Sequence, residues 1–412
     1  MSDYDIIIIG GGASGLCTAI NAKTENNKIL IIDKDQLPGR KILSTGNGKC
    51  NLTNEYCTVS SFYKNPEGIY PYFSQGKRDF IESIISGFDY NDTLSFFKRL
   101  GLLTVNKNGY IYPRTYQAKT VRDVLIKNVS ASGTDILSSH KIRRIEKDNG
   151  LYIIDDKYRA PNLVISTGGM ASTKGDADGL GYELAKAFGH SVTSLRPALC
   201  ALACRGSVFR DISGVRTDAL VSVYNNDRLI MKSFGNLQFT GYGISGIPVF
   251  QISSEAGSLL EDSQKPVIKI DPLYDLSEDD LYELIKDRKD EYFLGILNSS
   301  LAKACCSAMS PKKGSLSDAE YKKCLCAAAK NFYFEPEKTA GFKNAQVTAG
   351  GIPTWEINPA TMESLICEGL YFTGEIIDVN GICGGYNLQW AWSTGYVCGS
   401  ALKNKYDKDL VS

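Results

Sequence analysis

The chain has 412 residues, of which 43% are hydrophobic and 22% charged, the balance of a folded globular protein. Lys plus Arg and Asp plus Glu both number 46, so the formal net charge is zero. A dedicated nucleic-acid binder is therefore not expected, because affinity for phosphate backbones depends on clustered positive charge. At roughly 150 residues per domain, this length predicts two or three domains.

Neither a membrane span nor an export signal is expected. No apolar run reaches the roughly 18 residues that a membrane-spanning helix needs. The N-terminal segment has no basic region ahead of its isoleucines, so it does not resemble a signal peptide. The sequence therefore predicts a cytoplasmic protein.

Metal binding is not expected either. The twelve cysteines should be free thiols, mostly small buried side chains, because no export signal precedes them. None forms a C-x2-C pair, and only two histidines, His140 and His190, could complete a metal site.

A β-α-β unit opens the chain. Residues 5–9 are a short apolar run rich in β-branched side chains, typical of a parallel strand covered on both faces. A helix is predicted over 14–24, and a second buried strand over 29–33.

The loop of this unit reads G-x-G-x-x-G and predicts dinucleotide binding. Gly10 permits the tight turn, Gly12 lets a pyrophosphate approach the backbone, and Gly15 allows close packing of helix on strand. Asp33 ends the second strand about 20 residues on, where an acid binds ribose and favours FAD or NAD over NADP. A strand–turn–helix without a ligand is the alternative. The expected cofactor contacts of the unit are Gly10, Gly12, Ala13, Ser14, Gly15, Asp33 and Lys34.

Farther along, helices are predicted over 79–100 and 118–130, and strands over 151–155 and 162–166. Residues 199–253 are Gly-rich with short alternating strands, as in a small β domain. Residues 276–332 return to helical periods, with Ser277 as a helix cap, and a final apolar helix is expected over about 387–402.

These changes of pattern predict one nucleotide-binding domain built from both ends of the chain, residues 1–194 and 348–412. A β domain (195–270 plus about 333–347) and a helical segment (271–332) are inserted between them.

Two later junctions favour FAD over NAD. Residues 163–169 run from a strand into Thr167-Gly168-Gly169, similar to the second fingerprint of two-dinucleotide-fold flavoproteins. Residues 369–375 place a strand before Gly374-Glu375, where such proteins put an acid on the ribityl chain, with Glu375 in place of the commoner Asp. Two ordinary strand-to-turn junctions are the alternative.

Several blocks carry a resemblance to a known family. They read GRKILSTGNGKCNLTN (39–54), GYIYPRTYQA (109–118), FTGYGISG (239–246), AQVTAGGI (345–352) and GLYFTGEIIDVNGICGGYNLQWAWSTG (369–395). The chain resembles the HI0933-like flavoproteins, which include YhiN-like, BaiN-like and aminoacetone-oxidase-family FAD-binding enzymes, over nearly its whole length. The resemblance implies an α/β fold: a glutathione-reductase-type FAD-binding domain interrupted by a β-barrel-like domain and a small helical domain. It implies FAD, bound non-covalently, but leaves the substrate open; a few members are described as reductases of conjugated steroid or bile-acid double bonds.

The loop at 40–51 is expected to cradle FAD. Arg40, Lys41 and Lys49 bring positive charge near the phosphates, although a solvated basic loop is the alternative. Cys50 has no partner at the C-x4-C spacing of disulfide reductases and is interpreted as an inert thiol. Ile142 falls where related folds contact adenine through the backbone. The further contacts expected here are Ser44, Gly46, Gly48 and Asn51.

The last helix opens at Gly384-Gly385-Tyr386-Asn387. Glycines would let the chain pass close to the flavin ring, and the helix N-terminus would place partial positive charge beside it; Gly385, Asn387 and Leu388 are the expected contacts. A capped core helix is the alternative, and Trp390 and Trp392 are interpreted as helix packing.

The catalytic residue is not identified by any motif. Tyr112, Arg114 and Tyr242 are the candidates, since a phenol could protonate carbon during reduction of a double bond. Tyr110, Tyr116 and Phe239 could add aromatic walls to a substrate pocket.

Three functions are consistent with these residues. The first is an FAD-dependent oxidoreductase that reduces an activated C=C bond of a small, steroid-like molecule by hydride transfer through flavin N5. The second is an amine or aminoketone oxidase, and the third an RNA-modifying flavoprotein, against which the zero net charge argues. No second dinucleotide fingerprint opens a full β-α-β unit, so NAD(P)H would dock transiently or another donor would replace it. Nothing in the sequence indicates the oligomeric state.

Overall fold

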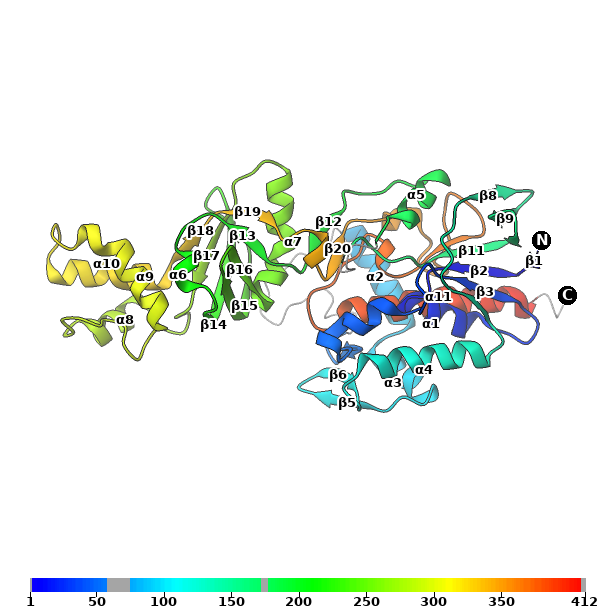
Figure 1. Cartoon of the computed structure of the whole chain (residues 1–412), viewed down its shortest axis with the longest axis horizontal. Helices are drawn as coiled ribbons and strands as arrows, with labels where there is room; N and C mark the ends of the chain where they lie inside the picture. The colour runs from blue at the N-terminus through cyan, green and yellow to red at the C-terminus, as the bar shows by residue number, and fades with distance from the viewer. Residues whose placement is uncertain (1, 58–74, 172–176, 409–412) are drawn as a thin grey trace. The chain divides into compact units, whose positions relative to one another are not determined.

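The computed structural model describes residues 2–57, 75–171 and 177–408. They form two compact units, which we call unit 1 (residues up to 195, together with 347 onward) and unit 2 (196–346) (Figure 1). Unit 1 is therefore discontinuous in the sequence, and unit 2 is one continuous insertion.

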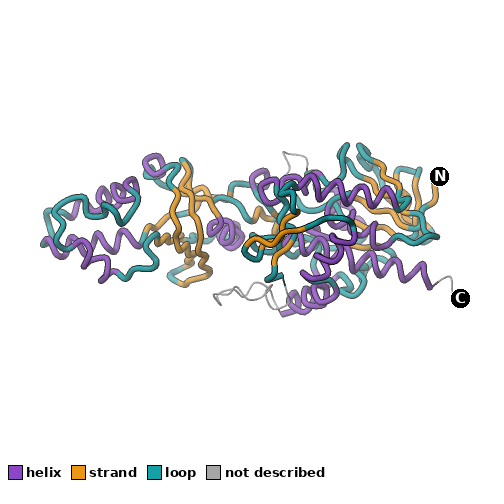
Figure 2. The backbone as a smooth tube through the Cα atoms, turned by 90° about the horizontal axis from the view of Figure 1, so that it is seen from below, coloured by secondary structure: helices purple, strands orange, loops and turns teal. Residues whose placement is uncertain are grey.

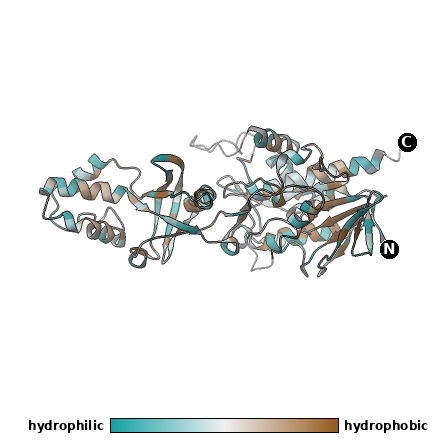
Figure 3. Ribbon diagram, turned by 90° about the horizontal axis from the view of Figure 1, so that it is seen from above, coloured by the Kyte–Doolittle hydropathy of each residue, from teal (hydrophilic) through white to brown (hydrophobic). Residues whose placement is uncertain are grey.

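Unit 1 is built on a five-stranded sheet in which every neighbouring pair is parallel. Its central strands are buried along their length and apolar except for Asn162, which is why the sheet accepts helices on both faces. The strands of this sheet are mostly hydrophobic in Figure 3. The order is β21 (Leu370–Phe372), β11 (Asn162–Ile165), β2 (Ile6–Ile9), β3 (Ile29–Ile32) and β7 (Asp135–Leu137).

Two helices from opposite ends of the chain pack against each other, α1 (Ala13–Ala22) and α11 (Tyr386–Lys408), both labelled in Figure 1. Helix α11 is the one that leads to the C-terminus in Figure 2. Glycines make the approach possible: a Cβ at Gly395 would lie 2.7 Å from the Ser14 carbonyl oxygen, and one at Gly399 2.8 Å from that of Thr18. The other helices of unit 1 are α2 (Gln75–Gly87), α3 (Tyr90–Arg99), α4 (Ala118–Ala131) and α5 (Leu180–Ala187).

The single helix expected over 79–100 is wrong, because the chain forms two helices there. Asp89 breaks the run: its carboxylate accepts hydrogen bonds from the backbone N–H groups of Asn91 and Asp92, while the Asp92 carboxylate accepts from the Asp89 N–H. This reciprocal capping begins a new helix at Tyr90.

Two small sheets complete the strands of unit 1. One has the order β1 (Ser2–Asp3), β10 (Tyr158–Ala160), β9 (Leu151–Ile154), β8 (Ile145–Asp148); the other has β4 (Thr53–Asn54), β6 (Tyr110–Pro113), β5 (Thr104–Lys107). The remaining elements of unit 1 are β20 (Val347–Ala349) and the 3-10 helices η1 (Arg40–Gly48), η4 (Thr354–Glu356) and η5 (Gly374–Ile376).

Unit 2 contains a seven-stranded antiparallel sheet. Its strand order is β18 (Phe332–Phe334), β17 (Val267–Asp271), β14 (Arg216–Asn225), β15 (Arg228–Thr240), β16 (Gly243–Gly246), β13 (Leu202–Cys204) and β19 (Pro336–Thr339). Helix α7 (Ile247–Glu261) packs on this sheet. The expectation of strands up to residue 253 is thus wrong, since a helix begins at Ile247 with Pro248 in its first turn, a position that proline tolerates.

A helical segment of unit 2 has its own apolar cluster, which includes Leu281, Ile285, Phe293 and Leu325. Ser277 caps the first of these helices, as expected, by accepting from the Asp280 N–H at 3.0 Å. The remaining elements of unit 2 are α6 (Phe209–Ile212), α8 (Glu278–Ile285), α9 (Ser299–Met309), α10 (Asp318–Lys330), β12 (Arg196–Ala198), η2 (Ser310–Lys312) and η3 (Phe342–Asn344). Among the helices of either unit that the structure describes, none is long and apolar enough to cross a membrane.

Candidate functional site

The glycine-rich loop follows β2 and leads into α1. Gly10 has a φ of +101°, and a Cβ there would lie 2.5 Å from the Ser166 carbonyl oxygen; a Cβ at Gly15 would lie 2.0 Å from the Gly10 oxygen. Gly12 differs, because the nearest atom to its Cβ position is 3.9 Å away. Gly10 and Gly15 are thus required by protein packing, whereas Gly12 leaves open space where a ligand can approach the backbone.

The start of α1 is not capped by any side chain of the described residues. Gly12 is its N-cap, so the N–H groups of the first turn, which include those of Ala13 and Ser14, remain available to an anion. The aligned peptide dipoles add partial positive charge at the same place. This end of α1 can therefore hold phosphate oxygens.

Asp33 lies just beyond β3 and is 9% exposed. Its Oδ2 accepts from the Gly11 N–H at 2.7 Å, and its Oδ1 accepts from the Asp35 N–H at 2.8 Å. Burial raises the pKa of this carboxyl above its ordinary value. Asp33 therefore fixes the glycine-rich loop to the end of the sheet, in addition to the ribose contact expected of it.

The segment expected to contact adenine runs beside Asp33. The N–H groups of Ser139 and His140 donate to the carbonyl oxygens of Asp35 and Asp33, both at 3.0 Å. Ile142 follows closely and is buried, with 5% exposure. The structure thus brings residues 139–142 to the same edge of the sheet as the ribose-binding acid.

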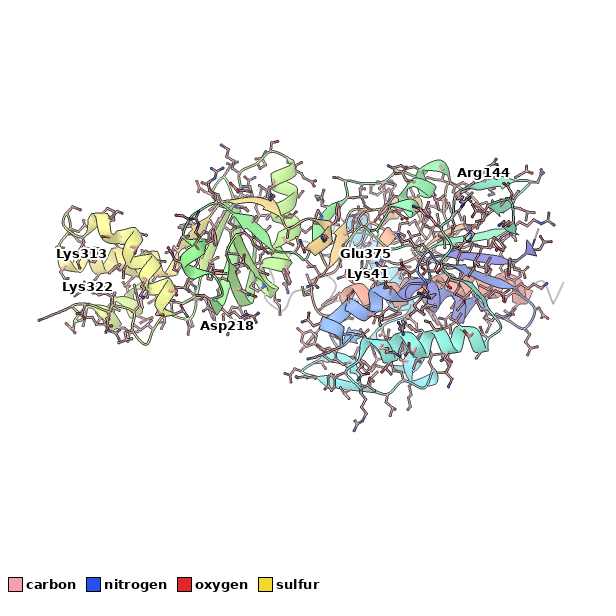
Figure 4. All side chains as sticks on the ribbon, viewed as in Figure 1. Lys41, Arg144, Asp218, Lys313, Lys322 and Glu375 are labelled. Atoms are coloured by element: carbon pink, nitrogen blue, oxygen red, sulfur yellow. The ribbon has the colours of Figure 1, made fainter. Side chains whose placement is uncertain are left out.

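The basic residues expected near the phosphates are engaged with carboxylates. Arg40 pairs with Asp35 at 3.0 Å, Lys34 pairs with Asp178 at 3.2 Å, and Lys41 pairs with Glu375 (Figure 4). Of the basic positions in the 40–51 loop, Lys49 is exposed. The carboxylates keep this cluster close to electrically neutral.

The backbone of the 40–51 loop turns sharply before β4. Gly46 and Gly48 have φ values of +54° and +82°, and a Cβ at Gly46 would lie 2.7 Å from the Asn51 nitrogen. The Ser44 hydroxyl donates to the Lys41 carbonyl oxygen at 2.9 Å. Cys50 is fully buried, and burial raises the pKa of its thiol to about 12, as befits an inert thiol.

Asn51 leaves a polar atom without a partner. Its Oδ1 is buried and accepts no hydrogen bond within the described part of the chain. Because a buried carbonyl oxygen without a donor costs about 1–3 kcal/mol, such an atom at an expected cofactor contact fits a bound molecule that carries a hydrogen-bond donor.

Glu375 joins the two later junctions predicted from the sequence. Besides the Lys41 contact, its Oε1 accepts from the Thr348 N–H at 2.8 Å. The Thr348 hydroxyl in turn accepts from the N–H groups of Met170 and Ala171, at 2.8 and 3.0 Å. Residues 374–375 and the turn after Thr167 and Gly168 are therefore held together through one threonine.

The glycines before α11 pack closely against other residues of unit 1. A Cβ at Gly385 would lie 2.9 Å from the Thr53 Cα, and one at Gly384 would lie 2.9 Å from the Tyr110 ring. Tight packing on β4 and β6 already requires glycine at both positions, and their contact with the flavin ring stays a prediction.

The start of α11 is organised by Asn387. Its Nδ2 donates to the Gly381 carbonyl oxygen at 3.0 Å, and its Oδ1 accepts from the Gly381 N–H at 2.8 Å. Leu388 is half-buried against the core. Trp390 and Trp392 are buried and donate their indole N–H groups to the carbonyl oxygens of Gly374 and Leu52, which agrees with a packing role.

The three catalytic candidates are not all in one unit. Tyr112 lies on β6, half-buried, with its ring 5.7 Å from that of Tyr116, and Arg114 is exposed just beyond the same strand. Tyr242 belongs to unit 2, where it is 55% exposed in the turn between β15 and β16.

Phe239 does not line a pocket as expected. Its side chain is fully buried in unit 2, with its ring 6.2 Å from that of Phe334. Side chains alternate between the two faces of a strand, and position 239 of β15 faces the core of the unit.

Sequence reasoning missed four residues of this region. They are Tyr182 on α5, Thr348, and the pair Lys77 and Asp378, whose charged groups lie 2.7 Å apart. All four lie near or within the Glu375 network. No motif marks Tyr182, whose helix is amphipathic like many others, whereas Thr348 falls inside the family block at 345–352. Among the described residues, no group of three or more His, Cys, Asp or Glu side chains could hold a metal ion.

Comparison with known proteins decides the family. The family profile described as "HI0933-like protein Rossmann domain" matches residues 4–401. The chain belongs to the HI0933-like family. It is 36% identical over 416 residues to the 3-dehydro-bile acid delta(4,6)-reductase of Clostridium scindens, covering 97% of this chain and 98% of that protein. It is 29% identical over 426 residues to the ribosomal RNA dihydrouridine synthase of Escherichia coli, covering 98% of each.

Solved structures share the fold at low identity. The 3-ketosteroid delta1-dehydrogenase from Sterolibacterium denitrificans matches with a TM-score of 0.53 at 10% identity, covering 98% of this chain and 100% of that one. The quinol fumarate reductase FrdA of E. coli matches with a TM-score of 0.52 at 16% identity, covering 99% and 71%. The prediction of an α/β protein with a Rossmann-type FAD-binding domain is confirmed.

The chain is thus an FAD-dependent oxidoreductase of the HI0933-like family. The described residues fit that cofactor: Gly12 leaves space, α1 offers uncapped N–H groups, and Asn51 keeps a buried acceptor without a partner.

Proposed function

We propose that this oxidoreductase reduces a carbon–carbon double bond conjugated to a carbonyl in a flat, steroid-like small molecule. The observation that carries the proposal is the 36% identity to the 3-dehydro-bile acid delta(4,6)-reductase, over 97% of this chain. The relatives described above are a reductase and a dihydrouridine synthase, so the amine or aminoketone oxidase considered from the sequence is not favoured.

The cofactor residues of unit 1 would hold FAD across the end of the sheet. The N-terminus of α1 and Gly12 would take the pyrophosphate, Asp33 the adenosine ribose, and Glu375 the ribityl chain. When bound and reduced by the electron donor, the flavin would supply the hydride that adds to one carbon of the double bond.

Tyr112 is the proposed proton donor to the adjacent carbon. Burial, together with the phenols of Tyr110 and Tyr116, raises the pKa of Tyr112 above its ordinary value, so its Oη keeps a proton at neutral pH. Arg114 follows on the same segment, where its guanidinium would polarise the substrate carbonyl. Unit 2, with the exposed Tyr242, would contribute to substrate choice.

The electron donor is proposed to be NADH or NADPH. One G-x-G-x-x-G opens a full β-α-β unit in this chain, and the cofactor residues assign it to FAD. A nicotinamide would therefore dock transiently, reduce the flavin and leave before the substrate enters.

Reduction of a uracil ring in RNA is the second candidate. The E. coli and Haemophilus influenzae ribosomal RNA dihydrouridine synthases are each 29% identical to this chain over 98% of its length. Uracil also carries a double bond conjugated to a carbonyl, so both candidates need the same chemistry at the flavin. The zero net charge and the lower identity favour the small molecule.

A flavin reoxidation experiment separates the candidates. Purified holoenzyme is reduced anaerobically with NADH or NADPH and mixed with a 3-oxo steroid that carries Δ4 and Δ6 double bonds, with its saturated counterpart as the matched control. We expect the flavin absorbance to return with the unsaturated steroid alone and the product to gain two hydrogens. Reoxidation by an unmodified ribosomal RNA fragment and not by the steroid would overturn the proposal in favour of RNA.

A further inference from the structure

Tyr182 carries a buried hydroxyl without a hydrogen-bond partner. The side chain lies on α5, the residue is 3% exposed, and its hydroxyl oxygen accepts and donates no hydrogen bond within the described ranges. An unpaired buried hydroxyl costs about 1–3 kcal/mol, so such groups usually face a water or a ligand. Tyr152 is a buried tyrosine of the ordinary kind: its hydroxyl donates to the Glu368 carbonyl oxygen at 2.8 Å.

The position of Tyr182 is fixed by close packing of the residue before it. A Cβ at Gly181 would lie 2.0 Å from the Thr167 Oγ1 and 2.7 Å from the Ile376 Cδ1. The first turn of α5 therefore presses against both junctions that were predicted to contact FAD, the turn after β11 and the turn after β21.

The surrounding charges make this hydroxyl a donor. The carboxylates of Glu375 and Asp378 act on Tyr182 electrostatically, and burial with these charges raises its pKa above the ordinary value. Both carboxylates already have cationic partners, Lys41 for Glu375 and Lys77 for Asp378. The phenol thus keeps its proton and lies near both carboxylates without donating a hydrogen bond to either.

A second unpaired hydroxyl belongs to the same turn. Thr373 is fully buried, its Oγ1 has no hydrogen-bond partner in the described part of the chain, and it directly precedes Gly374 and Glu375. Two elements distant in sequence therefore each leave a buried hydroxyl unsatisfied, and Gly181 of α5 packs closely on Ile376 of the segment after β21. A molecule with several oxygen atoms would satisfy both.

We propose that Tyr182 is a cofactor-positioning residue whose hydroxyl donates a hydrogen bond to an oxygen in the middle section of FAD, the ribityl chain or the pyrophosphate. The hydrogen bond fixes that section against the Glu375 turn. The inference depends on FAD binding and not on the substrate, so it can fail while the proposed reduction stands, and the reverse is also true.

The test compares Tyr182→Phe with Tyr152→Phe, two variants that each remove one buried hydroxyl. Holoenzyme is diluted into a large excess of a flavin-binding apoprotein, and the release of FAD and the flavin absorption bands are followed. Loss of one neutral hydrogen bond should speed release from Tyr182→Phe about 3- to 10-fold and shift the bands. Tyr152→Phe should release FAD at the wild-type rate, although it unfolds at a lower urea concentration because it loses the contacts of this hydroxyl with the Glu368 carbonyl oxygen and the Cys367 Sγ.

Two results would overturn the proposal. Wild-type release and unshifted bands in Tyr182→Phe would show that the hydroxyl meets only water. Equal acceleration in both variants would show a structural effect that any lost buried hydroxyl produces.

Discussion

Asp33 combines two tasks in one carboxylate. It accepts hydrogen bonds from the Gly11 and Asp35 N–H groups and so shapes the glycine-rich loop. Its remaining lone pairs would accept hydrogen bonds from the ribose hydroxyls. An amide of the same size can keep one of these acceptor contacts but loses the charge. The position is therefore sensitive to charge more than to size.

Asp33→Asn should weaken FAD binding. Loss of hydrogen bonds to a charged acceptor costs about 1.5–3 kcal/mol, which is roughly 10- to 100-fold in affinity. Titration of FAD into variant protein that has been depleted of the cofactor measures the change. Asp135→Asn is the matched control, since among the described residues that acid accepts a hydrogen bond from the Tyr4 hydroxyl alone. Unchanged FAD affinity in Asp33→Asn would show that the ribose acid lies elsewhere.

Tyr112→Phe tests the proposed proton donor. The variant should keep FAD but lose about 100-fold or more in kcat with the unsaturated steroid, because general acid catalysis contributes about 10²- to 10⁴-fold. Reduction of its flavin by NAD(P)H should proceed at the wild-type rate, so that only the oxidative half-reaction slows in stopped-flow traces. Tyr116→Phe, which changes the neighbouring exposed phenol, is the control. If both variants turn over normally, another group or water protonates the carbon.

Among the elements, the contact between α1 and α11 depends most on small residues. Gly395 and Gly399 bring the two backbones together, and α11 is also tied to the rest of unit 1 by a buried amide. Gln389 donates to the Phe88 carbonyl oxygen at 3.1 Å and accepts from the hydroxyls of Thr53 and Thr93, at 2.6 and 2.9 Å. The helix that closes the cofactor domain is thus fixed by both shape and hydrogen bonds.

Gly395→Ala should destabilise unit 1. The new methyl group would lie 2.7 Å from the Ser14 carbonyl oxygen, and forced overpacking of this kind costs about 1–3 kcal/mol. Urea unfolding followed by flavin release measures the loss. Gly87→Ala is the control, because its Cβ would make an ordinary contact of 3.5 Å with Val397 at the exposed end of α2. If Gly395→Ala were as stable as Gly87→Ala, α1 and α11 would have moved apart to accept the methyl group without loss of stability.

The elements near the cofactor were predictable where their signals are local. The apolar runs of β2 and β3, the glycines between them and the Asp33 position follow from neighbours in the sequence. The α2–α3 break was also encoded locally, in the Asp89 and Asp92 pair, but apolar spacing outweighed it in the prediction.

Long-range partners were not predictable, because nothing in the sequence couples them. Lys41 and Glu375 are 334 positions apart, and each looked like a ligand contact before the structure showed them paired. Gly385 shows a similar limit: a glycine required by close packing on Thr53 has the same sequence signature as one required by a ring.

At the scale of the whole molecule, His190 links segments that are distant in sequence. His190 is buried between two partners, with its Nδ1 2.7 Å from the Glu356 carboxylate and its Nε2 2.7 Å from the Ser364 hydroxyl. The Ser364 oxygen also accepts from the N–H groups of Ile366 and Cys367. A serine that is buried and held in this way stabilises the fold and is not exposed to a substrate.

Acid should destabilise the protein through His190. Burial lowers the pKa of this histidine below its ordinary value of 6.5, and this outweighs the opposing effect of Glu356. The unfolded chain therefore binds more protons, so this contribution to stability is complete above pH 6.5 and is lost as the pH falls towards the folded-state pKa. Urea unfolding at several pH values should show a shallower acid slope for His190→Gln than for the native protein. If the native protein instead becomes less stable as the pH rises through this range, Glu356 keeps the His190 ring charged.

The discontinuity of unit 1 has a consequence for synthesis on the ribosome. Unit 2 is one uninterrupted stretch, and its last residue leaves the exit tunnel before β21 and α11 emerge. Until then β11 lacks its neighbour on one edge, and the apolar face of α1 that α11 will cover is open to water. The nascent chain must therefore carry the insertion while the sheet of unit 1 is still unfinished. At this stage chaperones have an exposed apolar surface to bind, and the flavin cannot yet be retained.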